Sequence, residues 1–423
     1  MTWTLLALPV VLFLFGVPVF AVLLAAATVT LLVFTTLPPL TLHQVMFGGV
    51  DQYALLAVPF FIFAGELMGR SGIAERLVAW VLSLTGHVRG SLGVATVGTA
   101  TLMGAISGSS PATVAAIGRT LYPSLLQSGY STRFAAGLIT SSGSIAIVVP
   151  PSIAMILYGA SAEQSIPRLF QAGLLPGLLI AGMMAGYIVL WANLRGVPRR
   201  AGFEFGRFVA ASRQAWAALL MPAVILIGIY AGWFSPTEAG GVACLYAMLV
   251  GRFLYRSLGW RDIVATAVES VYLTAQVLVI VAAAGVFSYL LTIQGVPQGL
   301  VAWIADLGLG PAEFLIAINV FLLLLGCFLD PTSAILVLTP ILIPVIGHLG
   351  IDPVHFGIIM TVNLSIGMFT PPFGLNIFVA QSVMTKDVIA IWRGILPFLA
   401  IQIVSLLIIT YVPALSLALP ALL

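Results

Sequence analysis

Two related stretches of this sequence decide its fold. The first is Thr140-Ser-Ser-Gly-Ser-Ile-Ala-Ile-Val-Val-Pro-Pro151, and the second, 221 positions later, is Thr361-Val-Asn-Leu-Ser-Ile-Gly-Met-Phe-Thr-Pro-Pro372. Each ends in two consecutive prolines, which lack a backbone N–H and clash with the preceding helical turn. A helix therefore has to break at each stretch, and the break frees backbone carbonyl groups inside an apolar segment.

The composition indicates a membrane protein. Of its 423 residues, 61% are hydrophobic and only 7% are charged, whereas soluble domains carry about 25% charged residues. The apolar runs are long enough to cross a hydrocarbon core about 30 Å thick as helices, and the period-two alternation typical of a transmembrane β-barrel is missing. These features exclude soluble enzymes, nucleic-acid-binding proteins and disordered proteins, and they predict an all-α polytopic membrane protein.

The basic residues predict the orientation of the membrane segments. If the segments 91–132 and 311–349 re-enter the membrane and return to their own side, every Lys and Arg except Arg168 falls on one side. The positive-inside rule makes that side cytoplasmic, with the N-terminus cytoplasmic and the C-terminus periplasmic. That side includes the cluster Arg195, Arg199, Arg200, Arg207 and Arg213. The expected crossings are 3–36, 53–69, 133–159, 172–195, 216–234, 238–256, 263–291, 354–380 and 390–419.

An internal repeat relates the two halves of the chain. Recurring Pro and Gly are informative because each imposes a particular backbone conformation. Five expected crossings lie between the copies, and because five is odd the copies have opposite orientations. Inverted repeats with broken helices are typical of secondary transporters. At the offset of 221, the matches are Pro123 with Pro344, Gly129 with Gly350, Thr140 with Thr361, Ser144 with Ser365, and Pro150-Pro151 with Pro371-Pro372.

We expect one membrane body over residues 1–423, with two re-entrant helical hairpins and two broken helices. Its parts are a first inverted repeat at 57–170 with hairpin 91–132 and broken helix 133–159, scaffold helices and a cytoplasmic basic loop at 172–256, a second inverted repeat at 280–385 with hairpin 311–349 and broken helix 354–380, and a C-terminal helix at 390–419.

The first hairpin carries a run of small and polar residues, Gly104-Ala-Ile-Ser-Gly-Ser-Ser-Pro-Ala-Thr113. Such a run cannot face lipid, because unpaired backbone groups are costly there. At a hairpin tip, its carbonyl and hydroxyl oxygens can replace the water shell of a cation such as sodium, and helix N-termini favour a carboxylate. A close helix–helix contact through small residues is the structural alternative. Gly326-Cys-Phe-Leu-Asp-Pro-Thr-Ser333 is the counterpart in the second half.

The few carboxylates have either structural or functional roles. Asp330 lies within an apolar segment, where a carboxylate is a functional candidate, and it also precedes Pro331, as a helix N-cap does. We expect Glu66 and Glu269 to reach the interface or pair with arginine, and Glu238 to stabilise a helix N-terminus. No P-loop lysine motif occurs, so the chain itself does not hydrolyse ATP.

A set of motifs in this sequence resembles the large membrane subunit of tripartite ATP-independent periplasmic (TRAP) transporters. The resemblance covers essentially the whole chain. The motifs are Gly65-Glu-Leu-Met68, Ser107-Gly-Ser-Ser-Pro-Ala-Thr113, Pro150-Pro-Ser-Ile153, Pro236-Thr-Glu-Ala239, Gly326-Cys-Phe-Leu-Asp-Pro331 and Thr370-Pro-Pro-Phe-Gly-Leu-Asn376.

This resemblance implies a sodium-driven elevator transporter in the bacterial inner membrane. A soluble periplasmic binding protein would deliver a small organic acid, and a small four-helix membrane subunit would be a separate chain. One departure is Ala146, where many relatives carry glycine. The implied ligands are Ser107, Gly108, Ser109, Gly143, Ser144 and Val148 for one sodium ion and Gly326, Asp330, Gly367, Met368 and Thr370 for a second, while the candidate substrate-binding residues are Ser110, Thr113, Asn363 and Asn376.

Another class of transporter shares these features. A stand-alone sodium/carboxylate symporter or antiporter of similar hairpin architecture would need no binding protein. A channel needs no doubled, inverted sites, and an intramembrane enzyme would need a nucleophile or a metal-ligand set, which the sequence does not supply. The sequence therefore predicts a non-enzymatic carrier, and the resemblance implies that it is coupled to sodium.

Overall fold

The computed structural model describes residues 2–197, 202 and 204–422, and all regular elements among them are helical. The chain is an all-α polytopic membrane protein, as its composition predicts. Within the described residues, six helices are long and apolar enough to cross a membrane: Tyr53–Arg70, Ile166–Leu194, Phe205–Tyr230, Trp260–Ile293, Pro331–His348 and Val388–Tyr411. The pair Thr132–Val148 and Ile153–Ser161, bent by 41°, makes a seventh span if it is counted as one.

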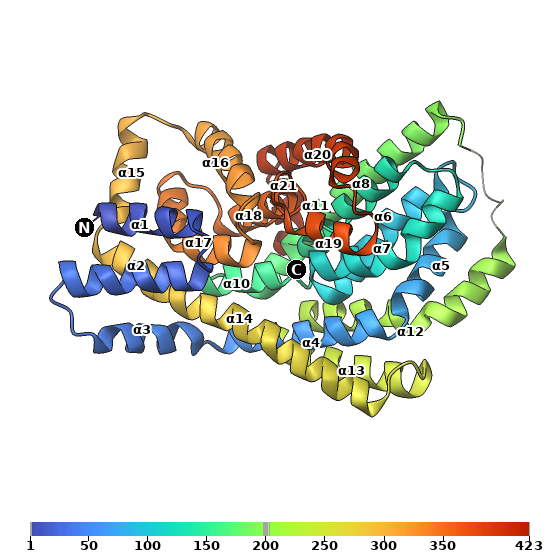
Figure 1. Cartoon of the computed structure of the whole chain (residues 1–423), viewed down its shortest axis with the longest axis horizontal. Coiled ribbons are helices and arrows are strands. Elements are labelled where there is room, and N and C mark those ends of the chain that lie inside the picture. Colours follow the sequence, from blue (N-terminus) through green and yellow to red (C-terminus); the bar gives the residue numbers. More distant parts are fainter. Residues whose placement is uncertain (1, 198–201, 203, 423) are drawn as a thin grey trace.

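Two helical hairpins lie on opposite sides of the molecule. In the first, α6 (Ser91–Ser107) and α7 (Ser110–Gln127) are joined at Gly108, whose φ of +56° suits glycine. In the second, α16 (Pro311–Gly326) and α17 (Pro331–His348) are joined by a short turn that ends at Asp330. The first hairpin lies on the right of Figure 1 and the second on the left.

A broken helix follows each hairpin. The first consists of α8 (Thr132–Ser142), α9 (Ile145–Val148) and α10 (Ile153–Ser161), and the second of α18 (Pro353–Gly367) and α19 (Leu375–Val383). Both breaks contain a proline pair, Pro150-Pro151 or Pro371-Pro372. The helices therefore stop where two successive residues cannot donate backbone hydrogen bonds.

The two halves exchange their last short helices. α10 packs against α17 of the second hairpin, and α19 packs against α7 of the first hairpin. Both short helices lie between the hairpins in Figure 1. The hairpin tips and the helix breaks of both halves are thereby gathered in the middle of the protein.

A group of long helices lies along one side of this centre. α14 (Trp260–Ile293) runs diagonally below the hairpins in Figure 1 and packs against α4 (Ala57–Arg70), which in turn packs against α13 (Pro236–Leu249). Ser235 and Glu238 form a capping box at the start of α13, as expected for Glu238. α13 ends in a π-helical turn, Val250–Leu254.

Further helices flank this group. α12 (Phe205–Tyr230) packs against α5 (Ile73–Thr85), whereas α15 (Val296–Asp306) packs against α17 and α14.

The range 172–256 does not form one packed group of helices. Its first helix, α11 (Ile166–Leu194), packs against α6, α18 and α20 and only slightly against α12. Glycines of α11 explain this placement, because a Cβ atom on Gly173 would lie 2.7 Å from the carbonyl oxygen of Val148. α11 therefore belongs with the hairpins, and α12 and α13 with α4 and α5. Of the basic cluster, Arg199 and Arg200 lie outside the described residues.

Two apolar runs form more helices than the sequence predicts. The run 3–36 contains α1 (Thr2–Leu14) and α2 (Val19–Phe34), separated by Gly16 with φ of +77° and by Pro18. The run 390–419 contains α20 (Val388–Tyr411) and α21 (Ala414–Leu422), with Pro413 between them. A further helix, α3 (Leu40–Val50), and a 3-10 turn, Tyr53–Leu56, follow α2. Average hydropathy does not show these breaks, whereas the Gly and Pro positions do.

The packing of α8 against α20 gives a stability prediction. A Cβ atom on Gly394 would lie 1.9 Å from the carbonyl oxygen of Arg133, whereas one on Gly186 of α11 would meet no atom within 4 Å. Gly394→Ala should therefore destabilise the protein by about 1–3 kcal/mol through overpacking. Thermal unfolding in detergent measures this change. Gly186→Ala is the matched control, and equal stability of the two variants would contradict the close packing.

Candidate functional site

A cavity of about 260 Å³ lies between the two hairpin tips. Residues of the first tip, of the second tip and of both helix breaks line it, and α4 and α14 complete its wall. Both halves of the chain thus contribute equivalent parts to one cavity. Its lining consists of Ile62, Gly65, Glu66, Ser107, Gly108, Ser109, Ser110, Pro111, Ala112, Ile147, Ile153, Ala154, Leu273, Gln276, Val277, Asp330, Pro331, Thr332, Met368 and Leu375.

Hydrogen bonds within the first tip fix its shape. The Thr113 hydroxyl donates to the carbonyl oxygen of Ser109 at 2.8 Å, and the Thr113 and Ser107 hydroxyls lie 3.2 Å apart. Gly108 rests directly on the break of the first broken helix, because a Cβ atom there would lie 2.7 Å from the carbonyl oxygen of Pro151. The left-handed backbone and this contact both require glycine at position 108.

A carboxylate fixes the second tip. Asp330 caps α17 by accepting hydrogen bonds from the backbone N–H of Ser333 at 3.1 Å and from the Ser333 hydroxyl at 2.5 Å. The capping role expected for Asp330 is therefore confirmed. Because Asp330 also lines the cavity, the cap holds a negative charge at the cavity wall.

Equivalent backbone contacts join each hairpin to its broken helix. A Cβ atom on Gly367 would lie 2.5 Å from the Cα of Gly326, and one on Gly104 would lie 2.4 Å from the Cα of Ala146. Gly104 thus provides the space that the methyl group of Ala146 needs. Although position 146 carries alanine and not glycine, the backbones of α6 and α9 are therefore still in contact.

Two of the candidate asparagines lie behind the cavity. Asn376, fully buried, donates to the Ser110 hydroxyl at 2.7 Å and to the carbonyl oxygen of Thr140 at 3.3 Å, so it joins the two halves. Asn363 donates to Asn319 of α16. Neither asparagine lines the cavity.

The remaining candidate residues hold the tips and the helix breaks in place. A Cβ atom on Gly143 would lie 3.2 Å from the carbonyl oxygen of Ser110. The Thr370 hydroxyl donates to the carbonyl oxygen of Ile366, and the Met368 carbonyl accepts from the backbone N–H of Asn376 at 2.9 Å. Of all the candidate residues, the cavity brings together Ser107, Gly108, Ser109, Ser110, Asp330 and Met368, whereas Thr113, Gly143, Ser144, Val148, Gly326, Asn363, Gly367, Thr370 and Asn376 lie outside its lining.

Sequence reasoning missed a buried amide beside the first break. Gln402 of α20 accepts a hydrogen bond from the Ser144 hydroxyl at 2.9 Å, and its amide nitrogen donates to the carbonyl oxygen of Ser141 at 3.1 Å and contacts the sulfur of Met184 at 3.2 Å. Its burial is complete. A single amide inside the apolar helix Val388–Tyr411 was the available signal, because a buried amide needs several partners.

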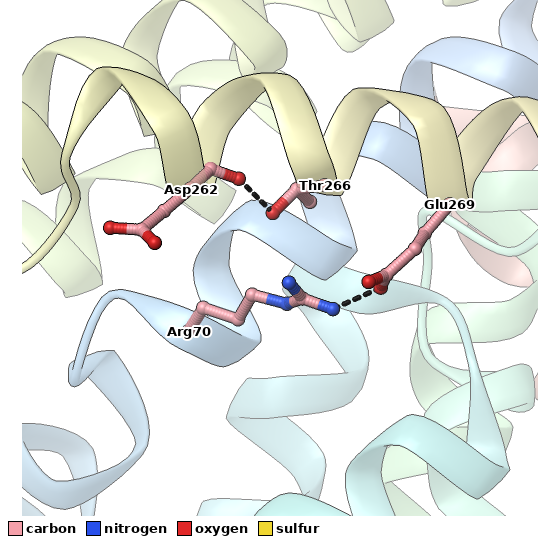
Figure 2. Close-up of polar contacts among 4 residues, drawn as sticks. All are labelled: Arg70, Asp262, Thr266 and Glu269. Atoms are coloured by element: carbon pink, nitrogen blue, oxygen red, sulfur yellow. Dashed lines mark hydrogen bonds and ion pairs between the residues drawn. The ribbon is translucent and has the colours of Figure 1, made fainter.

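An ion pair joins α4 and α14 outside the cavity lining. Figure 2 shows Arg70 of α4 pointing to Glu269 of α14, and the two side chains form a salt bridge, as expected for Glu269. On the same stretch of α14, the Thr266 hydroxyl donates to the carbonyl oxygen of Asp262 at 2.7 Å. Glu66, one turn before Arg70, faces the cavity instead. Among the described residues that line the cavity, two are acidic, Glu66 and Asp330, and none is basic.

A solved structure supports the fold. The chain is similar to the YdaH transporter of Alcanivorax borkumensis, with a TM-score of 0.60, 16% identity, and coverage of 95% of this chain and 98% of that one. At this identity the likeness concerns the fold alone.

Curated relatives are much more similar in sequence. The C4-dicarboxylate TRAP transporter large permease protein DctM of Pseudomonas aeruginosa is 41% identical, covering 93% of this chain and 92% of its own. The ectoine TRAP transporter large permease protein TeaC of Halomonas elongata is 40% identical, covering 89% of this chain and 88% of its own. The isethionate TRAP transporter permease protein DctMQ of Oleidesulfovibrio alaskensis is 38% identical, covering 94% of this chain and 63% of its own.

Residues 6–415 match the family described as "Tripartite ATP-independent periplasmic transporter, DctM component". The match takes in both hairpins, both broken helices and the cavity between them. The chain therefore belongs to the DctM component family of tripartite ATP-independent periplasmic transporters, as a large permease.

Proposed function

We propose that this permease takes up a small organic acid across the bacterial inner membrane, coupled to sodium and supplied by a periplasmic binding protein. The names of its relatives include the acids C4-dicarboxylate and isethionate, and the family is described as tripartite and periplasmic. We also propose a small four-helix membrane subunit as a partner. In support, the relative named DctMQ extends well beyond the part that aligns with this chain.

The charge of the central cavity carries the proposal. Two carboxylates, Glu66 and Asp330, face it, and no basic residue occurs in its described lining. An organic anion entering this cavity would meet like charge at low dielectric, which is strongly unfavourable. Bound cations would remove this penalty, and the carbonyl and hydroxyl oxygens of the tips are suitable ligands for a hard cation. Sodium and the acid would then bind together, which is coupling through linkage.

We place one sodium ion near the first tip and its broken helix. Ser107, Gly108 and Ser109 line the cavity, and Gly143 and Ser144 lie behind them. Both hydrogen-bond partners of the Ser144 hydroxyl, the Ser141 carbonyl and Gln402, accept from it. Its proton is therefore committed, and its oxygen lone pairs are left for a cation. Val148 lies farther back, with its carbonyl oxygen next to Gly173.

We place a second sodium ion among the equivalent residues of the other half. Asp330 would supply the negative charge. The backbone carbonyl groups of Met368 and Thr370 would supply further oxygens, because these residues follow Gly367, which is in close contact with Gly326. Ser110 then contacts the substrate from the cavity lining, and Asn376 acts through it by a 2.7 Å hydrogen bond. Thr113 would support the first tip, and Asn363 would support the contact between α16 and α18.

The transport motion we propose is an elevator movement. The hairpins, the broken helices, α11 and α20 would move as one body, since they pack against one another. The group α4, α12 and α13, with α14, would stay fixed and offers the opposite wall of the cavity. The cavity lies between these groups, so their relative displacement would carry its contents across the membrane.

Uptake in liposomes tests this function. The permease would be reconstituted with the neighbouring small subunit and binding protein, and labelled C4-dicarboxylate, isethionate and ectoine followed with and without an inward sodium gradient. We expect uptake of at least one of these substrates only when both sodium and the binding protein are present. Sodium-dependent uptake by the chain alone would instead support a stand-alone symporter, and uptake indifferent to sodium would contradict the coupling.

Substitutions of Asp330 separate its two roles. Asp330→Asn keeps an oxygen for the cap of α17 but removes the charge, whereas Asp330→Ala removes both. We expect both variants to raise the half-saturating sodium concentration for uptake, and only Asp330→Ala to lose about 1 kcal/mol of stability with the cap. Uptake assays and thermal unfolding measure the two effects. Wild-type sodium dependence in Asp330→Asn would refute the assignment of this carboxylate.

Gln402→Leu tests the orientation of Ser144. Without the amide, the Ser144 hydroxyl is no longer oriented by α20, so the half-saturating sodium concentration should rise by roughly tenfold, equivalent to one lost hydrogen bond, while maximal uptake persists. Ser405→Ala is the control, because Ser405 lies on the same helix but bonds to Ile401 and Met183. Equal sodium curves for Gln402→Leu and Ser405→Ala would contradict the role of Gln402.

A further inference from the structure

A second cavity, of about 430 Å³, lies away from the hairpin tips. It is bounded by the start of α8, the end of α11 and the start of α20, which lie together in the upper part of Figure 1. Three arginines, Arg133, Arg195 and Arg393, face it, together with the aromatic residues Phe134, Tyr187 and Trp191.

The charge of this arginine pocket is uncompensated. Within the part of the chain that the structure describes, the pocket lining contains no acidic residue, and the two salt bridges found, Arg70–Glu269 and Arg207–Glu204, involve other arginines. Arg133 is the second residue of α8, where the helix dipole opposes a positive charge. An anion in the pocket would offset both the mutual repulsion and the dipole.

Packing prevents the arginine-bearing helices from separating. A Cβ atom on Gly137 of α8 would lie 2.1 Å from the backbone of Gly394, and Arg393 is the residue before it. The rings of Phe134 and Trp191 stack with centroids 3.9 Å apart and tie α8 to α11. Arg133 and Arg393 are thus held on α8 and α20, whose backbones are in contact. Arg195 lies at the end of α11, which the ring stacking holds against α8.

The position of the pocket indicates where its ligand comes from. α11 and α20 are both long and apolar enough to cross a membrane. Arg195 directly follows the last residue of α11, and Arg393 is in the second turn of α20. The pocket therefore lies at the ends of two spanning helices, where lipid headgroups are found and where Tyr and Trp are enriched.

We propose that the arginine pocket binds the phosphate group of an anionic phospholipid, with Arg133, Arg195 and Arg393 as its ligands. Guanidinium groups suit phosphate because they donate several parallel hydrogen bonds, and basic pockets between membrane helices bind such headgroups. The aromatic side chains line the pocket beside the glycerol. A free phosphate ion has the same chemistry, so the test separates the two sources.

Lipid-dependent thermal stability tests this site. The full-length chain would be delipidated in mild detergent, and its unfolding temperature followed during titration with phosphatidylglycerol, phosphatidylcholine or inorganic phosphate at constant ionic strength. Arg133→Gln, Arg195→Gln and Arg393→Gln remove the ligands one at a time. Arg168→Gln is the matched control, because Arg168 lies exposed at the opposite end of α11.

We expect phosphatidylglycerol to raise the unfolding temperature of the wild-type chain more than phosphatidylcholine does. Each pocket variant should raise the half-maximal phosphatidylglycerol concentration by roughly tenfold, as for one lost charge-assisted hydrogen bond, and Arg168→Gln should leave it unchanged. Because each variant is compared with itself in two lipids, a lower baseline stability does not affect the result.

The other outcomes are also decisive. A shift with inorganic phosphate alone that Arg133→Gln removes would support the anion site and identify a soluble phosphate as its ligand. Equal shifts with phosphatidylglycerol and phosphatidylcholine, or a phosphatidylglycerol effect unchanged in all three pocket variants, would overturn the proposal.

Discussion

The interruption of helices inside the membrane is the constraint on which the rest of the structure depends. A proline pair interrupts each broken helix, and the backbone groups it frees cannot be left facing lipid. The structure meets this requirement by placing a hairpin tip on each break, with Gly108 against Pro151 in the first half and Gly326 against Gly367 in the second. The backbone oxygens that cannot face lipid are thereby brought together around one cavity.

This arrangement explains why small residues and a carboxylate occur together at the centre. Small residues let backbones approach to contact distance, and Asp330 both caps α17 and faces the cavity. Glu66 adds a second carboxyl group to the cavity lining, whereas the neighbouring Arg70 forms a salt bridge with Glu269. A cavity of this charge is suited to an anion only when cations accompany it, which links the packing of the helices to the proposed coupling.

The sequence predicted the hairpins, the breaks and the membrane class because Pro, Gly and hydropathy each act locally. It predicted the capping roles of Asp330 and Glu238 for the same reason. It did not predict that α11 packs with the hairpins, that Asn363 lies behind the cavity, or that Gln402 reaches the first break. These features depend on contacts between residues far apart in the chain, which a local pattern does not specify.

The central claim is that this chain itself holds sodium at the hairpin tips. Equilibrium binding of radioactive sodium to the purified permease, without substrate or binding protein, tests it most directly. The account predicts saturable binding that unlabelled sodium displaces and potassium does not, and that Asp330→Asn weakens. Absence of saturable binding to the folded wild-type chain would contradict the account.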